Sequence, residues 1–324
     1  MNNNKKNSLV ELFKNRELLF GFVLLVIFFS VMSDSFFSTS NITNILLTTS
    51  IGGVLSLGLT LVMITGDFDL SFASAIGLIN IFILVLLNQG FSLWLVFLFA
   101  IVAGIVWAGI NGILVVKLGM HAFVATIATW TVCKGIIYWI SGGATYYGDY
   151  PKSLSIIGRG TVGMFPISSI IFLIITIMII LLANYSKFGR RMYAVGNNSE
   201  AAEYVGINSK KTRMIAFLLE GSLIGFAAII LASKLCSGPA SGGDGFQMNV
   251  IASAFLGATV FRPGLVNVGG SILGIFLLSV IENGLIMLNV HFYFKYIIQG
   301  LIIIAAVAFI SLRSKKKNEG PPVI

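Results

Sequence analysis

Four acidic residues lie inside or directly beside long apolar stretches of this sequence. Asp67 and Asp69 lie in the segment Gly66-Asp67-Phe68-Asp69-Leu70-Ser71, between two apolar runs. Glu220 and Glu282 lie within two later runs. An ionised side chain at the centre of a membrane helix costs about 2.5–3.5 kcal/mol on insertion scales, so such groups normally face a cavity or a partner. These carboxyl groups are therefore candidates for contact with a solute or an ion.

The same residues also have structural explanations. Asp69 comes after a glycine and directly before an apolar run, which is a position typical of a helix N-cap worth about 1 kcal/mol. On this interpretation Asp69 starts a discontinuous or re-entrant helix. If the preceding apolar run is unbroken, residues 66–71 lie near the cytoplasmic end instead. Glu220 and Glu282 are more often packing or hydrogen-bonding residues of a helix bundle than ligands.

The sequence motifs of common enzyme sites are absent. There is no G-x-x-x-x-G-K-[ST] phosphate loop, no G-x-S-x-G and no H-E-x-x-H, and the only histidines are His121 and His291. Cys133 and Cys236 form no C-x-x-C pair. We therefore expect no catalytic, metal-binding or cofactor-binding residue in this chain. No motif for nucleic-acid binding is present either.

The composition indicates which elements hold these side chains. Apolar residues make up 57% of the 324 residues, charged residues only 10%, and the mean hydropathy is +0.96. Soluble domains carry about 25% charged residues. A helix needs about 20 apolar residues to cross a bilayer. The sequence therefore predicts an all-α polytopic membrane protein of about ten transmembrane helices, roughly at 18–32, 42–64, 71–87, 92–116, 122–140, 167–183, 214–232, 248–261, 268–288 and 292–310.

The basic residues predict the orientation, because cytoplasmic loops carry an excess of lysine and arginine. Most of the 21 basic residues fall on one side of the ten runs: Lys5, Lys6, Lys14, Arg16, Lys117, Lys187, Arg190, Arg191, Lys210, Lys211, Arg213, Arg262, Arg313, Lys315, Lys316 and Lys317. We expect one transmembrane domain over residues 1–324, with cytoplasmic tails at 1–17 and 312–324. The loop 184–213 is then cytoplasmic and the loop 141–166 is external.

Two features predict contacts rather than chemistry. The G-x-x-x-G segments Gly221–Gly225 and Gly270–Gly274 let helix backbones approach closely, within the chain or with a second copy. The external loop 141–166 is rich in tyrosine and glycine. It is either a lid or docking surface for an external partner, or a solvated connector with interface-anchoring tyrosines.

The inner loop contains a short helix signal. Capping residues at 197–199 precede the run Glu200-Ala201-Ala202-Glu203-Tyr204-Val205, and Gly206 ends it. Acidic residues in the first turn favour the helix dipole. A two-turn helix on the cytoplasmic face is a surface that a soluble motor subunit could push against, although a helical loop without function explains the pattern equally well.

Several motifs together resemble one family. The run Phe188-Gly189-Arg190-Arg191-Met192-Tyr193-Ala194-Val195-Gly196-Asn197, with Ala201-Ala202 and Gly206-Ile207, is similar to the ribose-type permeases of bacterial ATP-binding cassette (ABC) sugar importers. The segment 66–71 resembles the Gly-Gly-Ile-Asp-Leu-Ser segment of that family, and Glu282-Asn283-Gly284-Leu285 follows its C-terminal half. The resemblance covers nearly the whole chain.

The resemblance implies a permease subunit in a bacterial inner membrane that works as a pair. Two cytoplasmic ATPase subunits would bind the ATP, and an extracytoplasmic binding protein would deliver the sugar. The residues that would line the translocation pathway are Gly66, Asp67, Asp69, Ser71, Glu220, Glu282 and Asn283. The residues that would form the coupling helix against the ATPase are Gly196, Asn197, Glu200, Ala201, Ala202, Glu203, Tyr204, Gly206 and Ile207.

Two departures leave the substrate open. Asp67 replaces the second glycine of the family motif, and residues 261–266 replace a more glycine-rich turn. Two other functions are weighed beside the importer. One is an ion-driven secondary carrier that uses Asp67, Asp69, Glu220 and Glu282 as a relay. The other is a membrane enzyme in which Asp67-Phe68-Asp69 binds a metal, although no further acidic cluster lies nearby in the sequence.

Overall fold

The structure is a computed structural model that describes residues 17–261 and 264–316. The predicted tails beyond these limits and the predicted turn at Arg262 lie outside the described residues. The described elements are α2 (Glu17–Met32), α3 (Thr39–Ile64), α4 (Phe72–Asn88), α5 (Leu93–Gly112), η1 (Ile113–Lys117), α6 (Ala122–Ser141), α7 (Leu154–Arg159), β1 (Thr161–Val162), β2 (Phe165–Pro166), α8 (Ile167–Ile180), η2 (Leu181–Tyr185), α9 (Lys187–Asn197), α10 (Ser199–Tyr204), α11 (Ser209–Leu235), α12 (Asp244–Gly257), α13 (Val268–Met287) and α14 (Phe292–Lys316). The two short strands pair antiparallel.

The all-α class is confirmed, because each of the ten predicted apolar runs contains a helix. Only six helices of the described part, however, are long and apolar enough to cross a membrane, fewer than the ten or so expected. Helix α12 has only 14 residues. At about 1.5 Å per residue it extends about 21 Å, short of the roughly 30 Å hydrocarbon core.

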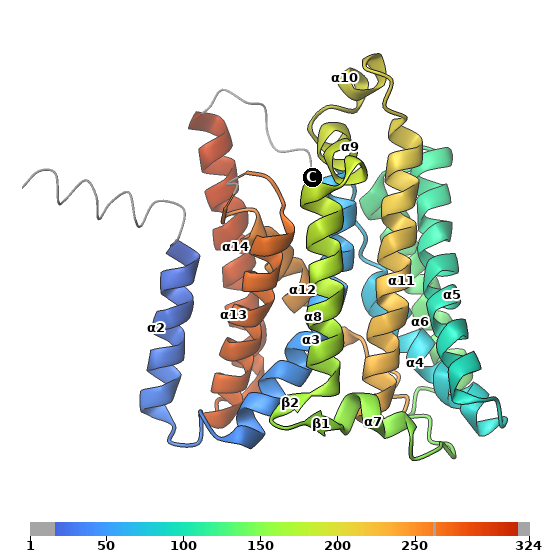
Figure 1. The fold of residues 1–324 in the computed structure, drawn as a ribbon, viewed down its shortest axis with the longest axis vertical. Coiled ribbons are helices and arrows are strands. Elements are labelled where there is room, and N and C mark those ends of the chain that lie inside the picture. The colour runs from blue at the N-terminus through green and yellow to red at the C-terminus, as the bar shows by residue number, and fades with distance from the viewer. Residues whose placement is uncertain (1–16, 262–263, 317–324) are drawn as a thin grey trace, which may run out of the picture.

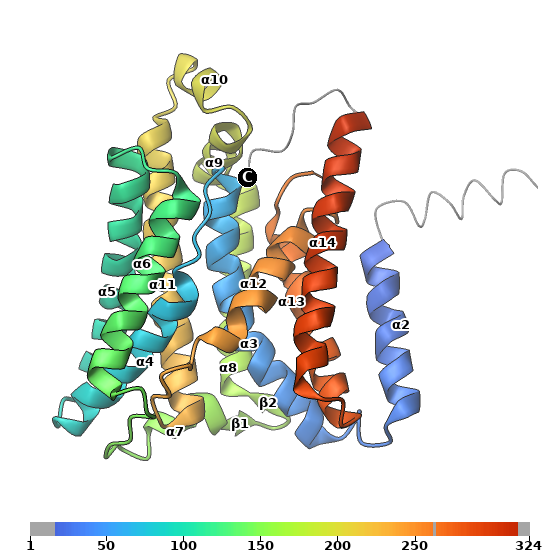
Figure 2. The ribbon, with the colours of Figure 1, turned by 180° about the vertical axis from the view of Figure 1, so that it is seen from behind.

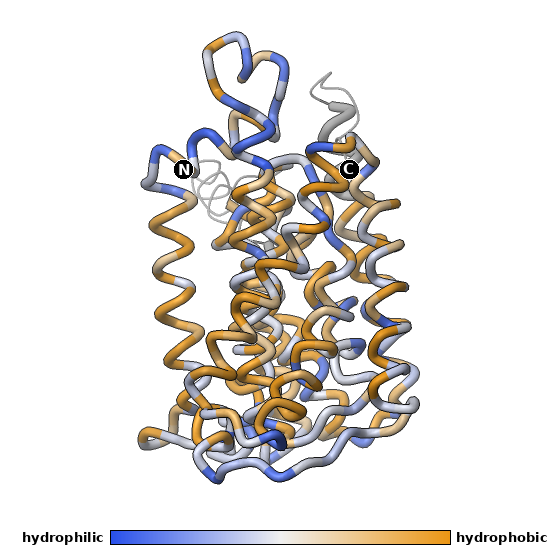
Figure 3. The backbone as a smooth tube through the Cα atoms, turned by 90° about the vertical axis from the view of Figure 1, so that its right-hand side faces the viewer, coloured by the Kyte–Doolittle hydropathy of each residue, from blue (hydrophilic) through white to orange (hydrophobic). Residues whose placement is uncertain are grey.

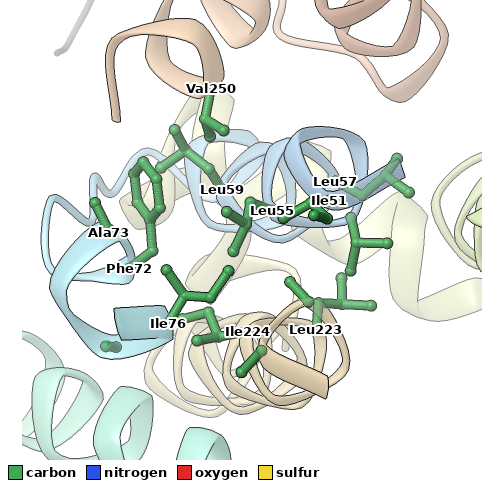
Figure 4. Close-up of a cluster of buried hydrophobic side chains, with 14 of the residues drawn as sticks. Ile51, Leu55, Leu57, Leu59, Phe72, Ala73, Ile76, Leu223, Ile224 and Val250 are labelled. Atoms are coloured by element: carbon green, nitrogen blue, oxygen red, sulfur yellow. The ribbon is translucent and has the colours of Figure 1, made fainter. Parts of the chain in front are cut away.

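The bundle is built around α3 and α11. In their most apolar windows, 83% of the residues of α3 and 67% of those of α11 are buried, against 28% for the α5 span. Figure 4 shows the centre of this core, where Ile51, Leu55 and Leu59 of α3 face Ile224 of α11 and Phe72 of α4. The peripheral helices leave apolar side chains on the outside, as a membrane protein requires. Figure 3 shows hydrophobic residues along the helices and hydrophilic residues at the two ends.

Two parts of the chain have the same design: a long central helix, then a break, then a shorter helix that begins inside the bundle. The shorter helices, called half-length below, have 17 residues in α4 and 14 in α12. Helix α3 runs to the end of the bundle where α9 and α10 lie, and residues 65–71 then return into the interior, where α4 begins (Figures 1 and 2). Helix α11 runs to the opposite end, and residues 236–243 return to the interior, where α12 begins. The two half-length helices then run in opposite directions. The sequence left two alternatives open for residues 66–71; α3 is unbroken as far as Ile64, near the α9–α10 end, and α4 then begins in the interior.

The starts of α4 and α12 meet inside the bundle because glycine allows it. A Cβ atom on Gly243, the N-cap of α12, would lie 1.8 Å from the carbonyl oxygen of Ala73 in α4. Gly77, one turn further along α4, faces the backbone nitrogen of Gly243. Any larger residue at 243 would separate the two helix starts.

The predicted close packing at the G-x-x-x-G segments is confirmed. Cβ atoms on Gly221 and Gly225 of α11 would lie 2.4 Å from the Gly104 oxygen and 2.6 Å from the Ile101 Cα atom of α5. A Cβ atom on Gly270 of α13 would lie 2.3 Å from the oxygen of Gly257 in α12. These contacts lie within the chain.

We predict that Gly221→Ala destabilises the protein by roughly 1–3 kcal/mol, because overpacking forces two helix backbones apart. The control is Gly135→Ala in α6, since a Cβ atom there would have no neighbour within 4 Å. Thermal melting of the purified protein in detergent measures both. Equal melting temperatures for the two variants would contradict the close α5–α11 contact.

Candidate functional site: the break between α3 and α4 and the α9–α10 projection

The break between α3 and α4 carries the first group of predicted site residues. The chain turns at Gly66, whose φ is +87°, a left-handed value that favours glycine. Asp67 and Asp69 are buried, with 6% and 0% exposed area, and so is Ser71 at 0%. The break is therefore a polar strip of backbone and side chains enclosed by apolar helices.

Asp69 holds the start of α4. One of its carboxylate oxygens accepts a hydrogen bond from the backbone N–H of Ser71 at 2.6 Å, and the other accepts from Nδ2 of Asn111 at 3.0 Å. Asn111 Nδ2 and Trp107 Nε1 donate to the hydroxyl of Ser71 at 2.6 and 3.1 Å. The N-cap residue is thus Ser71 rather than Asp69. Asp69 fixes that N-cap from two residues upstream.

Glu220 lies beside this group. It is fully buried in α11, and its carboxyl group faces Asp69. Gly58 of α3 makes room for it, because a Cβ atom there would lie 3.2 Å from Cγ of Glu220. The tertiary structure therefore brings together two of the predicted pathway carboxyl groups that are far apart in the sequence.

Glu282 and Asn283 belong to a separate polar group on α13. Glu282 accepts a hydrogen bond from Nδ2 of Asn249 in α12 at 2.6 Å and forms an ion pair with Lys295 of α14. Gln299 donates to Oδ1 of Asn249 at 2.6 Å. A small pocket beside these residues has room for about one water molecule. Asn283 instead contacts Asn41, at 2.9 Å between the two amides.

A third polar group was missed by the sequence analysis. Lys134 of α6 forms an ion pair with Asp244, the first residue of α12. The Lys134 ammonium also lies 5.9 Å from the ring centroid of Trp130. The side chain of Asp244 is 43% exposed, although α12 begins in the interior of the bundle. A lysine inside the apolar run 122–140 was the signal that could have located this pair.

The α9–α10 projection carries the second set of predicted site residues. Helix α9 packs against the end of the bundle, and α10 extends beyond it (Figure 1). The predicted short helix is confirmed as α10. Its N-cap is Asn198, whose side chain accepts from Ala201 N–H at 2.9 Å, and Gly206 follows it with φ +82°. Helix α9, which includes Gly196 and Asn197, was not predicted and lengthens the structured part of the loop.

The α10 helix presents an exposed tip and a buried base. Tyr204 is 91% exposed and Val205 is 75% exposed, whereas Ala202 is buried at 3%. Ile207 N–H bonds back to the carbonyl of Ala202 at 2.9 Å. Glu200, Ala201 and Glu203 are exposed as well. An apolar tip flanked by acidic residues is a surface suited to a protein partner.

The projection and the break touch one another. A Cβ atom on Gly196 at the end of α9 would lie 1.9 Å from the carbonyl oxygen of Ile64 at the end of α3. Arg213 of α11 donates from Nε and Nη2 to the two carboxylate oxygens of Asp67, at 2.7 and 2.5 Å. Asp67 and Asp69 therefore face different partners, which disfavours the hypothesis of one metal ion bound between them.

We predict that Asp69→Ala lowers the melting temperature, because Ser71 N–H and Asn111 Nδ2 lose their acceptor in a buried site. An unsatisfied buried donor costs roughly 1–3 kcal/mol. Asp34→Ala is the control, since Asp34 is exposed in the turn before α3. Unchanged stability of the Asp69 variant, combined with an altered solute preference, would instead indicate direct contact with the solute.

Comparison with known proteins identifies the family to which the chain belongs. Residues 41–307 match the family described as the permease component of the branched-chain amino acid transport system. The chain is 31% identical to the L-arabinose transport system permease protein AraH of Escherichia coli (strain K12), over 93% of this chain and 92% of the relative. It is 31% identical to the ribose import permease protein RbsC of Bacillus subtilis (strain 168), over 92% of each chain.

A third relative has another named solute. The autoinducer 2 import system permease protein LsrC of Yersinia pseudotuberculosis (serotype O:1b, strain IP 31758) is 33% identical over 91% of this chain and 84% of the relative. No solved structure was found to match. The resemblance to ribose-type permeases that the motifs predicted is confirmed by these matches. A family match over most of the chain, together with relatives aligned over nearly its full length, shows that this membrane protein belongs to the permease family of the branched-chain amino acid transport system type.

Proposed function

We propose that this chain forms the translocation pathway of an ABC importer for a monosaccharide or a similar small polar solute. The observation that carries the proposal is the near-full-length similarity to import permeases whose names include L-arabinose and ribose. A permease of this kind is a transporter subunit and not an enzyme, and the ATP is bound by a partner subunit.

We propose that the pathway passes the two interior helix starts. Irregular backbone at membrane depth is tolerated only where protein buries it or where it lines a water-filled cavity. Discontinuous helices near the midplane form the substrate sites of many transporters. The half-exposed Asp244 carboxylate supports this course, because a charge facing lipid at that depth would be costly. Gly66, Asp67, Asp69 and Ser71 then shape the pathway from the other helix start.

The other predicted pathway residues act around this centre. The carboxyl group of Glu220 in α11 faces Asp69, and its complete burial favours a role in shaping the pathway. Glu282 and Asn283 hold α13 against α12 and α3 through Asn249 and Asn41. We propose that the ten helical segments together make up the permease fold of ABC importers, with α4 and α12 as half-length segments.

The two ends of the bundle indicate where partner proteins would bind. We propose that the α9–α10 end faces the cytoplasm, because Lys187, Arg190, Arg191, Lys210 and Lys211 lie there. An ATPase subunit would then seat the exposed Tyr204 and Val205 in a groove. The opposite end, with α7, β1 and β2, would face an extracytoplasmic binding protein. Both termini would be cytoplasmic, and a second permease subunit would complete the pathway in the bacterial inner membrane.

We predict that Tyr204→Ala uncouples ATP hydrolysis from uptake while membrane insertion stays normal, because the variant removes an exposed ring that contacts nothing essential within the subunit. The test reconstitutes the permease with its ATPase and binding protein in liposomes and measures hydrolysis and uptake in parallel. Tyr204→Phe, which keeps the ring, is the control and should retain coupling. Normal coupled uptake by the alanine variant would contradict the role of α10.

A further inference from the structure

The α9–α10 projection and the break at residues 65–71 are in close contact, so one cannot move far without displacing the other. The end of α9 packs so closely on the end of α3 that only glycine fits at position 196, since a Cβ atom would lie 1.9 Å from the oxygen of Ile64. Gly66 lies against the same glycine. The first residues of the break are therefore packed against the projection.

The base of α10 is also joined to α11. The hydroxyl of Ser209, the first residue of α11, donates to the carbonyl oxygen of Ser199, the first residue of α10, at 3.1 Å. Asn208 caps α11 by accepting from Lys211 N–H at 2.8 Å. Arg213 comes one turn after Ser209, on the same side of the helix. A displacement of α10 therefore moves the turn of α11 that carries Arg213.

Arg213 connects that turn to the break. Its two hydrogen bonds to the Asp67 carboxylate form a bidentate pair, which fixes orientation as well as distance. The Asp67 side chain is 4% exposed and the Arg213 side chain 28% exposed. Salt screens such a partly buried pair much less than a surface pair.

The break in turn fixes the position at which α4 starts. Asp67 is two residues before Asp69, whose carboxylate accepts from the N–H of Ser71, the N-cap of α4. The first turns of α4 then contact Gly243 at the start of α12. These contacts thus lead from α10 through Arg213 and Asp67 to both interior helix starts.

We infer that the Asp67–Arg213 ion pair is the positioning link that transmits movement of α10 to residues 65–71 and so to the interior ends of α4 and α12. This inference rests on the proposed function, because it assigns α10 to an ATPase partner. Neither residue needs to touch the solute. Their role is to move the interior ends of α4 and α12 when the ATPase subunit moves α10.

The first test measures coupling in the complete transporter. The permease is reconstituted with its ATPase and binding protein in liposomes, with radiolabelled D-ribose and L-arabinose as probes, and the moles of sugar taken up per ATP hydrolysed are determined. Asp67→Asn and Arg213→Gln should each lower this ratio at least threefold. The exchanged pair, Asp67→Arg with Arg213→Asp, should recover part of it. A merely structural role would reduce the amount of intact transporter but leave the ratio of the surviving transporters unchanged.

The matched control is Arg159→Gln. Arg159 of α7 also makes two hydrogen bonds, from Nε and Nη2 to the carbonyl oxygens of Lys234 and Leu235, but it does so at the opposite end of α11. Because Arg159 lies at the end that would face the binding protein, any effect on docking lowers hydrolysis and uptake together, and the ratio of sugar to ATP should stay unchanged. An equal fall for Arg159→Gln and Arg213→Gln would overturn the inference.

The second test needs neither a partner nor a solute. Amide hydrogen exchange is followed at residues 65–75 of the purified permease. Asp67→Asn and Arg213→Gln should raise exchange there several-fold, and Arg159→Gln should not. Unchanged exchange in both pair variants overturns the link. A wild-type transporter without ATP-dependent uptake of either sugar would overturn the proposed sugar import instead, and altered exchange in that case would still support the link.

Discussion

Backbone groups inside an apolar bundle have no water to bond with, and the break between α3 and α4 depends on how that requirement is met. The carboxylate of Asp69 accepts the N–H of Ser71, and Asn111 and Trp107 from α5 complete the hydrogen bonds around it. Because these partners are present, the chain can leave α3 at one end of the bundle and begin a new helix in the interior. The half-length geometry of α4 follows from this one cluster.

The second break repeats the design in the opposite direction, and glycine lets the two meet. Helix α12 begins beside the first turn of α4 because Gly243 has no Cβ atom. Each helix start has an aspartate next to it, Asp69 for α4 and Asp244 for α12. A carboxylate is favourable there because the N-terminal end of a helix dipole is positive. These two helix starts form the polar centre that we propose the transported solute passes.

The remaining polar groups have two different roles. One group holds neighbouring helices of the bundle together, and the other connects the break to α11. Glu282, Asn249, Lys295 and Gln299 join α12, α13 and α14, well away from the α9–α10 projection. Asp67 and Arg213 join the break to the first turns of α11. Asp67 stands where the family motif that the segment resembles has glycine, and its charge lies where the break meets α11. This charge is paired with Arg213, and loss of that partner would leave a buried carboxylate uncompensated.

The amino-acid sequence by itself determined the all-α membrane class, the ten apolar helical runs, the short helix before Gly206 and the membership of a permease family. These features depend on local composition, on capping residues and on motifs, all of which are adjacent in the chain. The close contacts at Gly221, Gly225 and Gly270 were also predictable, because small residues at that spacing permit helices to approach.

Only the tertiary structure decided where α4 and α12 begin and which polar residues meet. The sequence analysis expected about ten transmembrane helices, since the length of an apolar run does not reveal at what depth its helix begins. It did not pair Asp67 with Arg213 or Lys134 with Asp244, because their partners are more than a hundred residues apart. The energy of an ion pair depends on distance in space, and that distance is set by how the intervening helices pack.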